Sequence, residues 1–75
     1  MQKEQIIQIA ENFGWTDLVP QKNPWMISFT YKDTGTRCNV YYTTGTVSIQ
    51  KKDGTFKYYY NTDTEEKYEP IFLNI

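Results

Sequence analysis

Apolar and polar residues follow two different periods along this chain, and each period predicts a type of element. Residues 2–13 carry apolar side chains at three- and four-residue spacing, which predicts an amphipathic helix. Gly14 stands where a helix-ending glycine belongs. Residues 16–24 include two prolines and predict an ordered crossing loop. The apolar stripe of the helix consists of Ile6, Ile9, Ala10 and Phe13.

Four later segments alternate with a period of two residues, as half-buried strands do. Turn residues separate them. Thr-Gly at 44–45 and Asp-Gly at 53–54 are typical of two-residue hairpin loops, and residues 33–36 form a longer loop. The predicted strands are residues 25–32, 37–43, 46–52 and 55–60.

The end of the chain predicts a second helix. Thr62 and Glu65 have the spacing of a capping box, and acidic residues suit the positive end of a helix. Pro70 removes one backbone hydrogen bond and can kink or end the helix. The expected apolar stripe is Tyr68, Ile71, Phe72 and Ile75.

Together these elements predict one small α+β domain over residues 1–75, in the order α-β-β-β-β-α. We expect a single four-stranded antiparallel meander sheet, with the N-terminal and C-terminal helices on one face. The other face stays open to solvent or to a partner. A chain of 75 residues has room for one hydrophobic core.

The turns predict which side chains share a face of the sheet. The four-residue loop at 33–36 and the two-residue loops bring apolar residues opposite one another and place Cys38, Tyr58 and Tyr60 on the core side. The predicted pairs are Phe29–Val40, Val40–Ile49, Tyr42–Val47, Ile49–Tyr58 and Val47–Tyr60. The open face then contains no carboxylate. On its last three strands it carries Arg37, Asn39, Tyr41, Thr46, Ser48, Gln50, Lys52, Thr55, Lys57 and Tyr59.

A row of cations crosses this predicted open face. Lys32, Arg37 and Lys52 would lie side by side on three strands, with Lys57 one row further in. Like charges in neighbouring positions repel, and an anionic partner such as a phosphate backbone would neutralise them. The alternative is that the cations are solvated and keep sheets from pairing.

Two tyrosines accompany the cations on the same face. Tyr41 and Tyr59 would flank a serine, and exposed rings of this kind stack on unpaired bases. Strand propensity alone also favours tyrosine here. We therefore predict a module that binds nucleic acid, in the form of single-stranded DNA or RNA. The candidate site residues are Lys32, Arg37, Asn39, Tyr41, Gln50, Lys52, Lys57 and Tyr59.

A protein partner is the alternative that the same face allows. Tyrosine, arginine and methionine are enriched at the centres of protein interfaces. The net charge of −1 favours this alternative, since nucleic-acid-binding domains are usually more basic. The protein would then act as an adaptor, an inhibitor or a homodimer formed through the edge strand 55–60.

Composition argues against catalysis. The chain has no histidine, which is the commonest general base and metal ligand. Cys38 is the single cysteine and lacks a histidine to activate it. We predict no enzyme activity, no metal and no cofactor. The sequence offers no disulfide, no apolar run long enough to span a membrane and no signal peptide. We therefore predict an intracellular protein, cytoplasmic or nuclear.

Residues 37–47, R-C-N-V-Y-Y-T-T-G-T-V, resemble a short R-x-N-V-Y-Y-T-T-G-T-V segment of uncharacterised proteins from plants, algae and protists. The resemblance extends over residues 37–72, with a basic-aromatic strand followed by a helix. This chain has Tyr59 and Tyr60 where we expect an arginine pair. The segment has no known function, so the resemblance implies none. The predicted sheet is also similar in outline to small sheets that bind single-stranded DNA.

Overall fold

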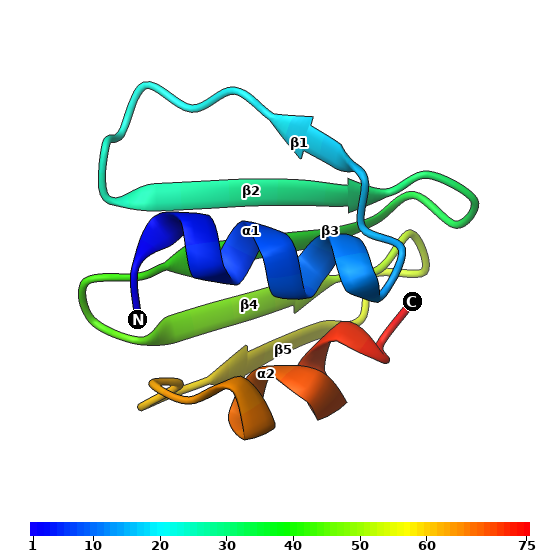
Figure 1. Cartoon of the computed structure of the whole chain (residues 1–75). Coiled ribbons are helices and arrows are strands. Elements are labelled where there is room, and N and C mark those ends of the chain that lie inside the picture. Colours follow the sequence, from blue (N-terminus) through cyan, green and yellow to red (C-terminus); the bar gives the residue numbers. More distant parts are fainter.

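The computed structural model describes all residues from Met1 to Ile75 and contains two helices and five strands. The strands form one antiparallel sheet in the order of the sequence, and both helices cover the same face (Figure 1). Neither helix is long and apolar enough to cross a membrane. The elements are α1 (Lys3–Asn12), β1 (Asp17–Val19), β2 (Met26–Tyr31), β3 (Thr36–Tyr41), β4 (Thr46–Gln50), β5 (Phe56–Tyr59) and α2 (Glu65–Phe72).

The structure confirms the α+β class, both helices and the antiparallel sheet, but the predicted number of four strands is wrong. Asp17–Val19 forms an additional edge strand, which pairs Leu18 with Phe29 of β2. Pro20 follows it directly, and proline has no N–H with which to continue a ladder. A strand of three residues is too short to show a period, so this segment was predicted as a loop.

The core lies between the inner face of the sheet and the two helices. Trp15 connects three elements there, since its backbone N–H donates to Ala10 O at 2.9 Å and its Nε1 donates to Phe72 O at 2.9 Å. Its ring packs edge-on against Tyr31. The buried apolar residues are Ile6, Ile9, Ala10, Trp15, Ile27, Phe29, Cys38, Val40, Val47, Ile49, Tyr68, Ile71 and Phe72.

Helix α2 begins two residues later than predicted. Thr64, not Thr62, is the capping residue, and its side chain accepts a hydrogen bond from Lys67 N. Thr62 is buried, and its N–H donates to Gly45 O at 2.9 Å. The helix continues for two residues beyond Pro70, and the predicted stripe residue Ile75 is exposed.

The first two long hairpins have four-residue loops, at residues 32–35 and 42–45. Gly35 and Gly45 end these loops with φ of +74° and +75°, and each donates its N–H to the tyrosine that precedes the loop. Val40 consequently pairs with Ile27 and Val47, not with Phe29 and Ile49. This error in register is two residues, so every side chain on β2, β3 and β4 keeps its predicted face.

The last hairpin has a different error, which reverses the faces of β5. Lys51 N donates to Thr55 O at 2.9 Å and closes a loop of three residues. Gly54 alone has positive φ, +92°, whereas the predicted type I′ turn requires positive φ at Asp53 as well. Val47 therefore pairs with Tyr59. A shift of one residue moves each side chain of the strand to the opposite face.

Tyr68 offers a test of the core. Its side chain is fully buried and its hydroxyl has no hydrogen-bond partner. Burial raises the pKa of Tyr68 to about 12. We expect Tyr68→Phe to raise the free energy of unfolding by about 1 kcal/mol, because it removes an unsatisfied buried hydroxyl. Urea denaturation followed by circular dichroism measures this.

Tyr42→Phe is the matched control for Tyr68→Phe. The Tyr42 hydroxyl donates to Pro24 O at 2.6 Å, so its removal should lower the free energy of unfolding by about 1 kcal/mol. A lower free energy of unfolding in Tyr68→Phe would show that the Tyr68 hydroxyl does form a stabilising hydrogen bond.

Candidate nucleic-acid interface

The open face of the sheet is a lattice of three rows that cross the strands. The first row is Asp17, Thr30, Arg37, Gln50 and Phe56. The second row is Val19, Ser28, Asn39, Ser48 and Tyr58. The third row is Met26, Tyr41 and Thr46, and Tyr60 follows β5 at the same end.

Three rings stand in a line along β5 and the residue that follows it, and we call Phe56, Tyr58 and Tyr60 the aromatic ladder. The Phe56 and Tyr58 ring centroids are 4.9 Å apart. Those of Tyr58 and Tyr60 are 6.3 Å apart, with ring planes inclined by only 12°. The three residues are 47%, 56% and 68% exposed, so the ladder offers its rings to solvent. Exposed rings held in register on a strand form a surface on which flat ligands stack.

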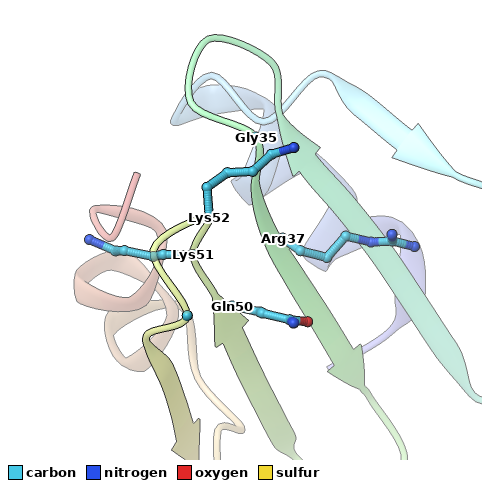
Figure 2. Close-up of a pocket in the computed structure, with 6 residues that line it drawn as sticks. Gly35, Arg37, Gln50, Lys51 and Lys52 are labelled. Atoms are coloured by element: carbon cyan, nitrogen blue, oxygen red, sulfur yellow. The ribbon is translucent and has the colours of Figure 1, made fainter.

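Positively charged residues surround an open hollow of about 350 Å³ at one end of the same face (Figure 2). Arg37, Gln50 and Lys52 extend toward one side of the sheet, whereas Lys51 extends away from them. Lys52 lies across Gly35, where a side chain would collide with its aliphatic part. The β2–β3 loop and the β4–β5 loop therefore meet at this hollow. Its lining is Gly35, Arg37, Gln50, Lys51, Lys52 and Gly54.

No carboxylate forms an ion pair with these cations. The structure contains one ion pair, between Lys67 Nζ and Asp63 Oδ1 at 2.8 Å, and it involves α2. Asp53 lies in the β4–β5 loop, where hydrogen bonds from the side chain and backbone of Thr55 hold its pKa below the ordinary value. Strand β1, which the sequence did not predict, adds Asp17 to the open face, so the expectation of a face without any carboxylate is wrong.

A chain of polar side chains fixes the base of the surface. Arg37 Nε donates to Ser28 Oγ at 2.9 Å, and that hydroxyl donates to Asn39 Oδ1 at 2.8 Å. Asn39 Nδ2 then donates to Ser48 Oγ at 3.3 Å. Both serines are buried, while Arg37 and Asn39 are half-buried. The terminal guanidinium nitrogens of Arg37 have no partner within the protein and remain available to a ligand.

Six of the eight predicted site residues lie on or beside this surface. Arg37, Asn39, Tyr41 and Gln50 are on the open face of β3 and β4. Lys52 is in the β4–β5 loop over the hollow, and Lys32 is exposed in the β2–β3 loop, outside the row predicted for it.

The predicted positions of Lys57 and Tyr59 on the open face are wrong. Lys57 pairs with Ile49 and Tyr59 with Val47, on the core side of β5. Tyr59 packs against the core, and its hydroxyl accepts a hydrogen bond from Asn74 Nδ2 at 3.3 Å. The aromatic ladder takes their place. The sequence did contain a signal for the ladder. Gly54 also suits the last position of a three-residue hairpin loop, and that loop places Phe56 and Tyr58 on the open face.

The acidic side chains and the single cysteine form no cluster at this surface. No three Cys, Asp or Glu side chains form a group that could hold a metal ion. Burial raises the pKa of the Cys38 thiol, so it stays protonated inside the core. A surface thiolate is therefore absent.

The surface combines three kinds of contact on one face. Arg37 and Lys52 supply positive charge, the amide of Gln50 is exposed without a hydrogen bond, and the ladder supplies aromatic area. Strands carry most of these side chains, which keeps their spacing constant. Comparisons of the chain with protein-family models, with curated proteins and with solved structures find no match.

Proposed function

We propose that this protein binds single-stranded DNA or RNA through the open face of its sheet. The aromatic ladder is the observation that carries the proposal, because its three exposed rings lie on the same face as cations that form no ion pair. Stacking of a base on an aromatic side chain is worth about 1–3 kcal/mol and tolerates any base. The ladder therefore contributes affinity without requiring a particular sequence.

The cations provide the contacts to the phosphate backbone. Arg37 shares a row with Phe56 and is two strands away, a distance of about 10 Å at normal strand spacing. A short nucleic-acid strand can therefore contact the hollow with its phosphates and the ladder with its bases. Guanidinium and ammonium groups are the usual partners of phosphates.

A single strand suits this surface better than a duplex. Stacking on the ladder requires an accessible base face, which a duplex hides within its own stack. Reading the major groove of a duplex requires a helix or a ribbon that projects from the protein. The open face is a sheet surface, and both helices lie on its far side (Figure 1).

A protein partner remains the second candidate, and the exposure of the ladder rings is the observation that favours it. Aromatic residues and arginine are enriched at the centres of protein interfaces. Salt separates the two candidates, because phosphate contacts release counterions and an aromatic protein interface does not.

The test is a fluorescence anisotropy titration of labelled single-stranded DNA and RNA oligonucleotides at several salt concentrations. About three phosphate contacts, from Lys32, Arg37 and Lys52, predict a slope of about −2 for the logarithm of affinity against the logarithm of salt. Lys52→Ala should reduce that slope by about 0.7.

Lys57→Ala is the matched control, since it removes an exposed lysine from the core side of the same sheet. Its slope should equal that of the unmodified protein. The absence of saturable binding to both oligonucleotides at low salt would rule out the proposal and leave the protein partner.

A further inference from the structure

Strand β5 is an open edge of the sheet. It has β4 on one side and no strand on the other. The opposite edge, β1, is only three residues long and is followed by Pro20, which are common means of protecting an edge. Strand β5 has no proline, and Lys57 is its one charged residue. A lysine also discourages pairing at an edge, so this edge is open to another strand only in a register that sets Lys57 opposite an uncharged residue.

The hydrogen bonds of the last hairpin show which backbone groups point outward. Lys51 N donates to Thr55 O, which places these two residues at a hydrogen-bonded position of the ladder. Pairs in an antiparallel ladder alternate, so Lys57 and Tyr59 direct their N–H and C=O groups to β4. Phe56 and Tyr58 direct theirs away from the sheet, and no loop or turn elsewhere in the chain bonds to them. The outward groups thus belong to residues of the aromatic ladder.

We propose that β5 pairs with β5 of a second copy of this chain, antiparallel and centred on Tyr58. The two sheets would join into one sheet of ten strands with a two-fold axis at Tyr58. The proposal concerns self-association and does not depend on nucleic-acid binding. The second copy would pair with the outward N–H and C=O groups of β5. It would also cover part of the three exposed rings beside them.

This register makes the edge complementary to itself. Tyr58 meets Tyr58 of the second copy, and Phe56 meets Tyr60 of the second copy, so the outward backbone groups of one strand face those of the other. The six ladder rings then lie together on the open face, where cross-strand aromatic pairs stabilise a sheet. On the opposite face Lys57 meets Tyr59 of the second copy, so no like charges are directly opposed.

The size of the contact sets its strength. Residues 56–60 and their three ladder rings provide less than the roughly 800 Å² per partner that is typical of stable complexes. We therefore expect a reversible dimer whose population rises with protein concentration. Binding of a strand of nucleic acid across both ladders would add to its stability, but the dimer forms without it.

Sedimentation equilibrium of the full chain without nucleic acid tests the proposal. The average mass should rise from 8.9 kDa toward twice that value as concentration increases. Tyr58→Lys should remain at 8.9 kDa over the same range, because it places two cations on the two-fold axis. Tyr41→Lys is the matched control. It makes the same change of charge on the open face, two strands away from the edge, and should dimerise as the unmodified protein does.

Amide hydrogen exchange gives a second readout, which also tests the register. In dilute protein the amides of Lys57 and Tyr59 should be protected and those of Phe56 and Tyr58 should exchange freely. At high concentration the protection of Phe56 and Tyr58 should increase by about tenfold or more. A constant mass of 8.9 kDa with unchanged exchange overturns the proposal, as does a Tyr58→Lys variant that dimerises normally.

Discussion

Replacing Tyr58 and Tyr60 together by alanine should weaken the binding of single-stranded oligonucleotides by about 30-fold or more. Each base stacked on an aromatic ring contributes about 1–3 kcal/mol, so the loss of two rings costs at least about 2 kcal/mol. The two tyrosines are 56% and 68% exposed, and neither is part of the core. The fold should therefore remain intact. Anisotropy titration at one fixed salt concentration measures the change in affinity.

Trp25→Ala is the control for this double variant. Trp25 is 58% exposed, as the ladder tyrosines are, but it precedes β2 and lies outside the ladder. Its removal should leave affinity for the oligonucleotide unchanged. Circular dichroism should show that both variants are folded. If the Tyr58 and Tyr60 double variant bound as tightly as the unmodified protein, the ladder would not be a stacking surface.

Trp15→Ala should remove a large part of the free energy of unfolding. Trp15 is fully buried, and its indole N–H donates to the backbone of Phe72 at the end of α2. Its ring lies 5.4 Å from that of Tyr31 and 5.9 Å from that of Phe72. Truncating a buried tryptophan to alanine costs about 3–5 kcal/mol. A domain of this size has a total stability of about 4–11 kcal/mol.

Urea denaturation followed by circular dichroism measures the loss. Trp25→Ala serves again as the matched control, because it removes the other tryptophan from an exposed site and should change stability by no more than about 0.5 kcal/mol. A loss below about 1 kcal/mol in Trp15→Ala would show that Trp15 does not hold the two helices to the sheet.

Whether a register error was an even or an odd number of residues explains which side chains were assigned to the correct face of the sheet. Both early hairpins were shifted by two residues, and because side chains alternate, Val40 still lies in the core and Arg37 still lies on the open face. The last hairpin was shifted by one residue, and this single error exchanged Tyr58 for Tyr59 at the proposed site. The predicted face of a side chain was therefore wrong only where the register error was an odd number of residues.

Turn chemistry was the source of all three errors. Asp-Gly and Thr-Gly occur in several loop types, and the sequence does not show which residue takes positive φ. Within each of the three hairpin loops only the glycine does so. The polar side chain of Asp53 instead accepts a hydrogen bond from Thr55 N at 2.8 Å, which stabilises the longer loop. Alternation alone predicted four of the five strands but gave no information on loop length.

The polar chain from Arg37 to Ser48 has a consequence for the entropy of binding. A free arginine side chain has about 2 kcal/mol of rotamer entropy, much of which is lost when it holds a ligand. Arg37 is already held through Nε by Ser28, and Asn39 holds Ser28 in turn. Much of the ordering therefore takes place when the protein folds, before any ligand arrives. Two buried serines that never touch the ligand would in this way increase its affinity.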